Sequence, residues 1–212
     1  MKKFKTIQEN CCEQIVEKKS KFIANVIYVS NKSETEEYIR QINKKYFDAR
    51  HNSYAYITLD EENNMIEKCS DDGEPSGTAG APMLNILKRN ELCNVLVVVT
   101  RYFGGVLLGT GGLVRVYSEA TLKALDSIKI IDMEIGEEIK VEIEYKDVES
   151  FKYFCRKNFV KITQEEYKNN VEFIIETTKE IAKLLYGNLD NFKFNITKIE
   201  KIKEKYIKID KY

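Results

Sequence analysis

Alternating apolar and charged positions dominate the second half of the chain. From residue 139 to residue 145 every second side chain is apolar, which is the period of a strand with one buried face. Strand and helix periods predict the remaining elements of this half: strands over 160–162 and 171–175, and a last strand that begins with residues 192–196. Two helices are also predicted, one capped by Asp147 with its apolar face over 151–155, and one opened by Thr178 with its inward residues over 181–185. The predicted order is βαββαβ, the split motif of ferredoxin-like domains.

The first half mixes both periods. Ser33-Glu34-Thr35-Glu36 is typical of a capping box, so a helix is predicted to begin there, with Tyr38, Ile39, Ile42 and Tyr46 on one face. Further patterns predict apolar segments over 12–16 and 22–29, strands over 53–59, 65–69 and 95–101, and helices over 81–89 and 113–125. An α+β fold with antiparallel strands follows.

Glycine and proline punctuate the chain unevenly. Both prolines and eight of the ten glycines lie between Gly73 and Gly112. Gly136 follows an apolar run and precedes the first strand of the second half, so it is the best candidate for a domain boundary. We therefore predict two domains, over residues 1–135 and 136–212.

Composition narrows the classes of function. The 34 basic and 34 acidic residues balance, which excludes a uniformly basic nucleic-acid-binding chain and requires any such binding to use a local patch. The longest aliphatic run, residues 95–99, is far shorter than the ~20 residues of a membrane-spanning helix. The five cysteines have no C-x-x-C spacing, and one histidine supplies little for a Cys/His zinc site. We expect a reduced, cytoplasmic protein with no cofactor, no metal and no membrane contact.

A polar loop precedes the helix predicted over 81–89. Its carboxylates, hydroxyls and flexible positions are Asp71, Asp72, Gly73, Glu74, Ser76, Gly77 and Thr78. One interpretation is a ligand site, in which the carboxylates hold a hard cation and the glycines allow close approach to the backbone. The other is a tight turn in which Ser76 or Thr78 caps the helix.

A second glycine-rich loop follows the buried strand. Arg101 and Tyr102 end that strand, and Gly109-Thr110-Gly111-Gly112 begins the next helix, where free N–H groups favour an anion. Thr110 stands where a Walker A motif requires lysine, so this is not a P-loop. A close-packed glycine turn, with Arg101 neutralising Asp71 or Asp72, is the alternative.

Arginine and histidine add candidates near these loops. Four of the six arginines lie between residues 50 and 115: Arg50, Arg89, Arg101 and Arg115. The planar guanidinium suits phosphate and carboxylate alike. Tyr102 can stack on a base or pack in the core. His51, the only histidine, is either a general base or a hydrogen-bonded structural residue.

Long segments of the chain resemble the YigZ/IMPACT family in its bacterial two-domain form. They are FDARHN at 47–52, SDDGEPSGTAGAPML at 70–84 and VVVTRYFGGVLLGTGGLVRVYSEA at 97–120, preceded by KSKFIA at 19–24. The resemblance implies a first domain like the second domain of a small-subunit ribosomal protein, as in domain IV of elongation factor G. It also implies a ferredoxin-like second domain similar to the last domain of that factor.

The resemblance further implies a role in translation control, with RNA or ribosome binding and no settled reaction. Two positions depart from the family pattern. Ser53 stands where many relatives have cysteine, which weighs against a catalytic thiol, and Ala81 stands where many have arginine or lysine, which removes a positive charge.

The favoured hypothesis is a non-enzymatic, translation-associated regulator that binds RNA or the ribosome; the sequence identifies no protein partner. Arg50, Arg101 and Arg115 would meet phosphates, the Gly109–Gly112 amides would hold an anion, and Tyr102 would stack on a base. The alternative is a hydrolase that holds a divalent cation between the carboxylates of the polar loop.

In the hydrolase, Asp71, Asp72 and Glu74 would bind the cation and His51 would be the base. Both hypotheses require the two loops to lie side by side. Because clustered carboxylates need a nearby cation, we predict Arg101 or Arg115 within salt-bridge distance of one of these carboxylates, with His51 bordering the same site.

Overall fold

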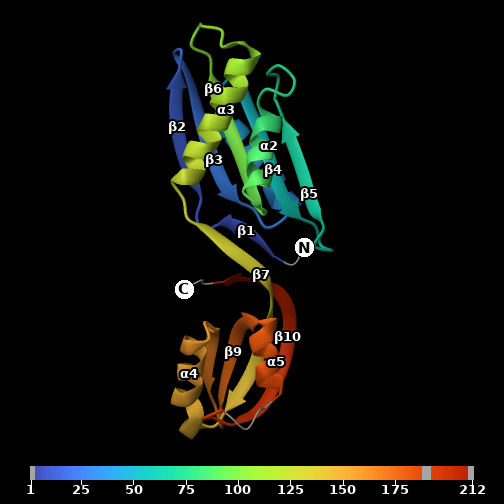
Figure 1. Ribbon diagram of the computed structural model, residues 1–212, viewed down its shortest axis with the longest axis vertical. Coiled ribbons are helices and arrows are strands. Elements are labelled where there is room, and N and C mark those ends of the chain that lie inside the picture. The colour runs from blue at the N-terminus through green and yellow to red at the C-terminus, as the bar shows by residue number, and fades with distance from the viewer. Residues whose placement is uncertain (1–2, 188–191, 210–212) are drawn as a thin grey trace. The chain divides into compact units, whose positions relative to one another are not determined.

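The structure of this protein is a computed structural model that describes residues 3–187 and 192–209. The chain divides into two compact units, Lys3–Ile131 and Asp132–Tyr212 (Figure 1). Each unit is α+β, with one antiparallel sheet and packed helices. None of the helices within the described ranges has the length and apolar content needed to span a bilayer.

The first unit is built on a five-stranded sheet. Its elements are β1 (Lys3–Ile7), β2 (Cys11–Glu17), β3 (Ser20–Tyr28), α1 (Lys32–Lys45), β4 (His51–Leu59), β5 (Met65–Ser70), α2 (Gly80–Arg89), β6 (Val95–Tyr102) and α3 (Gly109–Asp126). The sheet order is β2-β3-β6-β4-β5, and α2 and α3 cover one of its faces (Figure 1). Helix α1 packs on the other face against Leu96 and Val98 of the central strand.

Helix α1 begins earlier than predicted. Asn31 is the N-cap, and its side chain accepts the N–H of Glu34 at 2.9 Å. Glu34 in turn accepts the backbone N–H of Ser30 at 2.7 Å. The helix is therefore capped by Asn31, with Glu34 bound to the residue before the cap, so the prediction that a capping box starts at Ser33 was wrong. Asparagine caps as well as serine, and it occurs two residues sooner.

The second unit has the predicted βαββαβ order. Its elements are β7 (Ile130–Ile143), a 3₁₀ turn (Tyr145–Asp147), α4 (Val148–Lys157), β8 (Lys161–Tyr167), β9 (Val171–Thr178), α5 (Lys179–Tyr186) and β10 (Ile196–Ile209). Strand β7 pairs with β10 and β9, and β9 pairs with β8, all antiparallel, which gives the order β10-β7-β9-β8 of a ferredoxin-like sheet. Strand β1 also pairs with β7 and is the fifth strand of this sheet. Residues 192–194 precede β10 and do not belong to it.

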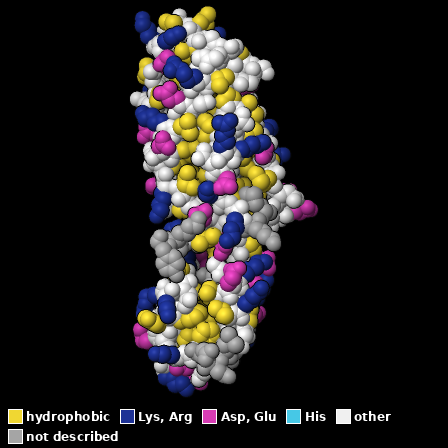
Figure 2. All heavy atoms as spheres, in the orientation of Figure 1, with side chains coloured by type: hydrophobic (Ala, Val, Ile, Leu, Met, Phe, Trp, Pro, Cys, Tyr) yellow, Lys and Arg dark blue, Asp and Glu magenta, His cyan; other side chains and the backbone are white. Residues whose placement is uncertain are grey.

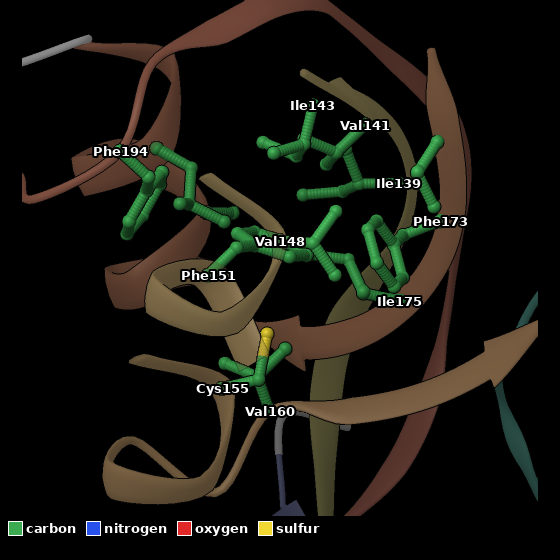
Figure 3. Packing of buried hydrophobic residues seen from close by; sticks show 13 residues of the cluster. Ile139, Val141, Ile143, Val148, Phe151, Cys155, Val160, Phe173, Ile175 and Phe194 are labelled. Carbon is green, nitrogen blue, oxygen red and sulfur yellow. The ribbon is translucent and has the colours of Figure 1, made fainter. Parts of the chain in front are cut away.

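Alternate residues of the strands form the core of this unit. Ile139 and Val141 of β7 and Phe173 of β9 point toward α4, which contributes Val148 and Phe151 (Figure 3). All five side chains are buried, as the alternating pattern predicts. This core holds the helices on one face of the sheet and leaves the other face to charged residues.

Gly136 lies inside β7 and not in a linker. The strand is continuous across it, and a Cβ there would stand 2.4 Å from the carbonyl oxygen of Thr177 and 2.5 Å from Cδ1 of Ile207. Its role is therefore close packing between strands. The observed division between units falls at Ile131 and Asp132, a few residues earlier than the boundary expected from this glycine.

Candidate functional site

The two loops singled out in the sequence lie at one end of the first unit. The chain between β5 and α2 and the chain between β6 and α3 both emerge there (Figure 1). Arg101 Nη1 donates to Glu74 Oε1 at 2.7 Å, so the predicted ion pair between the loops is confirmed. Arg115 is paired elsewhere, with Glu17 at 2.6 Å.

The ion pair of Arg101 and Glu74 is buried. Their relative exposures are 5% and 7%, and the Tyr117 hydroxyl also donates to Glu74 Oε1 at 2.9 Å. The guanidinium lies 5.4 Å from the ring of Phe22 and 5.5 Å from that of Phe103, within cation–π range. Burial, with the adjacent Glu74 carboxylate, raises the pKa of Tyr117, so this phenol remains a neutral donor. Arg101 is consequently withdrawn from the surface and cannot serve as a phosphate contact.

His51 borders this cluster, as predicted. Its Nε2 is 3.9 Å from Glu74 Oε2. Its Nδ1 donates to the carbonyl oxygen of Asp72 at 2.7 Å, an assignment that follows because a carbonyl only accepts. The next two residues of β4 continue the attachment: the N–H of Asn52 donates to Asp72 Oδ2 at 2.6 Å, and the hydroxyl of Ser53 donates to the Asp71 carbonyl at 2.7 Å. Three consecutive residues of one strand thus fasten the polar loop.

Asp71 organises the remainder of the polar loop. Its carboxylate accepts the N–H groups of Gly77, Ala79 and Gly80 at 2.9, 2.9 and 2.8 Å. Partial burial opposes ionisation, but these three hydrogen bonds outweigh it and hold the pKa of Asp71 below its usual range.

The free backbone N–H groups at the start of α2 are therefore bound by the Asp71 side chain, which lies nine residues before Gly80 in the chain. The N-cap is Ala79, so the prediction that Ser76 or Thr78 caps the helix was wrong. Ser76 is exposed, and the Thr78 hydroxyl donates to the Pro75 carbonyl at 2.6 Å. Gly73 and Gly77 adopt φ of +83° and +74°, a left-handed conformation that favours glycine.

The geometry does not support the cation-dependent hydrolase. Asp71 is bound by backbone N–H groups, Asp72 by the N–H of Asn52, and Glu74 by Arg101 and Tyr117. These carboxylates therefore do not converge on a common point. Over residues 3–187 and 192–209, no three His, Cys, Asp or Glu side chains are grouped so that they could hold a metal ion.

The glycines of the second loop have two different roles. A Cβ on Gly104 would lie 2.0 Å from the carbonyl carbon of Lys19, so this glycine allows the loop to cross the β2–β3 turn. Gly109 and Gly111, in contrast, have open space around them. The N-cap of α3, Leu108, offers no side-chain acceptor, and the first turn of the helix has no acidic residue. The N–H groups at the start of α3 are therefore available to an anion.

Cations collect at the same end of the unit. Lys21 of β3 is directly opposite Tyr102 of β6, and the register of β4 continues to place Arg50 on the other side of Tyr102. Opposite residues share a face, so the three side chains form a row across three strands. Arg50 also stacks on the Phe103 ring at 5.4 Å, and the Tyr102 hydroxyl donates to Asp48 at 2.8 Å.

The β2–β3 turn adds Lys18 and Lys19 to this end. Within the described ranges, Lys18, Lys19, Lys21 and Arg50 form no ion pair. We define the loop-end surface as the exposed side chains Lys18, Lys19, Lys21, Arg50 and Phe103, the half-buried Tyr102, and the N–H groups of Gly109, Thr110 and Gly111. Sequence reasoning missed the three lysines, although the cluster of lysines in a short turn was a visible signal.

Comparisons with known proteins agree with the resemblance in the sequence. The Impact N-terminal domain family matches residues 18–125, and a domain of unknown function, DUF1949, matches residues 141–183. IMPACT family member YvyE of Bacillus subtilis is 38% identical over 168 residues, covering 79% of this chain and 76% of the relative.

An IMPACT family member of Haemophilus influenzae is 35% identical over 175 residues, covering 81% of this chain and 84% of the relative. A crystal structure of a hypothetical protein is similar over 93% of this chain and 98% of its own, with a TM-score of 0.60 and 25% identity. The match to the family over both units, at this identity and coverage, shows that the chain belongs to the IMPACT family.

Proposed function

We propose that this protein is a non-enzymatic, translation-associated regulator whose loop-end surface binds RNA, including RNA of the ribosome. The observation that carries the proposal is the group of unpaired cations Lys18, Lys19, Lys21 and Arg50 at one end of the first sheet. Unpaired cations remain hydrated and available, whereas a cation in an ion pair must first give up its partner.

The chemistry of the loop-end surface suits single-stranded RNA. Lysine and arginine neutralise phosphates, and the open N–H groups at the start of α3 can donate hydrogen bonds to a further phosphate oxygen. Phe47, 84% exposed, and Phe103, 38% exposed, provide rings on which bases can stack. Tyr102 belongs to the same row, but its hydroxyl donates to Asp48, so only its ring is available to a base.

The mixed charges on the rest of the protein favour RNA binding only at the loop-end surface. The net charge of the chain is zero, and basic and acidic side chains are interspersed over the face shown in Figure 2. Four phosphate contacts on a single strand correspond to a slope of about −3 in log K against log salt. Binding should therefore be measurable at low salt and weaken steeply at moderate salt.

Fluorescence anisotropy with a labelled single-stranded RNA tests the proposal. The double variant Lys21→Ala/Arg50→Ala removes two cations of the loop-end surface, and the slope against salt should fall by about 1.4. The double variant Lys32→Ala/Arg40→Ala is the matched control, because it removes two cations of α1 that are paired with Glu36 and Glu37. Equal losses in both variants, or no binding of RNA at low salt, would refute the proposal.

A second experiment addresses translation. Sedimentation of the full chain with ribosomes at low salt should leave it in the ribosomal pellet, and the Lys21→Ala/Arg50→Ala variant should remain in the supernatant. Binding to free RNA without ribosome association would restrict the function to an RNA-binding protein outside translation.

A further inference from the structure

We propose that the second unit has its own binding site for a small planar aromatic anion, formed by α4 and the segment that precedes β10. A hollow of about 600 Å³ lies there, within the range of small-molecule sites. Its lining combines rings with polar groups: Tyr153, Phe154 and Phe192, with Glu149, Lys157 and Lys193. The site is separate from the loop-end surface and does not depend on the proposed function.

The rings of this hollow are held in place by the core. Phe194 is buried and packs edge-on against Phe151 of α4, with the ring centroids 5.3 Å apart (Figure 3). Phe192 stacks on Phe194 at 4.9 Å and meets Phe154 edge-on at 5.1 Å. The wall is therefore preorganised, so a ligand does not have to order it on binding.

Tyr153 is the ring left for a ligand. It is 62% exposed, and no ring contact or hydrogen bond involves it within the described ranges. A planar ring that enters the hollow would lie between Tyr153 and the edges of the phenylalanine rings. Aromatic pairs of this kind favour offset-stacked or edge-on contacts.

The charge of the hollow specifies an anion. Lys157 and Lys193 form no ion pair within the described ranges. The lysines of the open sheet face differ: Lys140 is paired with Glu172, and Lys205 with Glu138 and Glu176. Two unpaired ammonium groups at an aromatic hollow would bind a phosphate or carboxylate attached to the ring. The Glu149 carboxylate can accept from a donor elsewhere on the ligand.

Two probes distinguish the sources of such an anion. Adenosine 5′-monophosphate carries its anion as a phosphate, and benzoate carries it as a carboxylate. Titration of the labelled full chain by NMR should give saturable shifts confined to α4 and residues 192–194 with at least one of them. Tighter binding of the first indicates a nucleotide, and tighter binding of the second indicates an aromatic acid.

Variants and partial ligands test each half of the proposal. Lys157→Ala/Lys193→Ala should weaken binding by about tenfold or more, whereas Lys183→Ala, an exposed lysine of α5, should leave it unchanged. Adenosine, which lacks the anion, and inorganic phosphate, which lacks the ring, should both bind more weakly than the monophosphate. The site is refuted if neither probe saturates at millimolar concentration, if the double variant binds as well as the wild type, or if the shifts lie elsewhere.

Discussion

Removal of Glu74 should be the most damaging single change at the end of the first unit. Glu74→Ala leaves the Arg101 guanidinium buried with no carboxylate, and it also removes the acceptor of the Tyr117 hydroxyl. Water has little access, because the side chain of Arg101 is only 6% exposed. The variant therefore creates an uncompensated buried charge.

The magnitude follows from this burial. Removing one partner of a buried pair costs about 3–5 kcal/mol, and the lost phenolic hydrogen bond adds about 1 kcal/mol. The cation–π contacts with Phe22 and Phe103 are present with and without Glu74, so they do not enter the difference. We expect a net loss of about 4–6 kcal/mol in the free energy of unfolding of the first unit. Glu74→Gln keeps an acceptor and should cost less.

Urea unfolding followed through NMR signals of β4 and β6 isolates this unit from the other. Glu37→Ala is the control, since it removes a carboxylate from an exposed ion pair with Arg40 and should change stability little. A Glu74→Ala loss no greater than that of the control would mean that the buried pair contributes little. The double variant Glu74→Leu/Arg101→Met should be more stable than Glu74→Ala, because no charge remains buried.

Three further outcomes follow from the geometry. Partial burial is outweighed by three hydrogen bonds, so the folded-state pKa of Asp71 is depressed. The stability that its ionised carboxylate contributes is therefore complete above the unfolded-state pKa of about 3.9 and is lost as the pH falls through the folded-state pKa. In Asp71→Asn, the free energy of unfolding should depend less on pH over this range, as measured by acid unfolding followed by circular dichroism. Gly104→Ala should cost more than about 2 kcal/mol in a thermal melt, because its Cβ would clash with the backbone at Lys19, whereas Gly105→Ala, at φ +85° in open space, should cost about 1 kcal/mol. Iodoacetamide at neutral pH should modify the exposed Cys12 well before Cys93, since burial raises the pKa of that thiol to about 11; equal rates by mass spectrometry would contradict this.

Local periodicity was sufficient for the second unit. Its two central strands, β7 and β9, alternate between buried and partly exposed residues, as in Ile139, Val141 and Ile143, so the βαββαβ order could be predicted without knowledge of contacts. The neighbouring positions of the two loops were also predictable, because clustered carboxylates require a cation. The pairing of Arg101 with Glu74 confirmed that electrostatic reasoning.

The other features of the site could not be predicted from the sequence, because they depend on contacts between residues far apart in the chain. Asp71 caps α2 although it lies nine residues before Gly80, and rules for helix caps consider only the residues next to the helix start. The burial of Arg101 depends on Phe22 and Tyr117 from two other elements. Lys21 becomes part of a cationic row only through its register with Tyr102, which the sequence does not specify.

Ultraviolet crosslinking of the full chain to single-stranded RNA tests the central claim most directly. We expect mass spectrometry to find the crosslinked nucleotide on peptides that contain Tyr102 or Phe103, the rings beside Lys21 and Arg50, or the exposed Phe47, whose neighbour Asp48 accepts from the Tyr102 hydroxyl. The yield should fall in the Lys21→Ala/Arg50→Ala variant and as salt rises. Crosslinks confined to the second unit, or the same yield in that variant, would contradict the assignment of RNA binding to the loop-end surface.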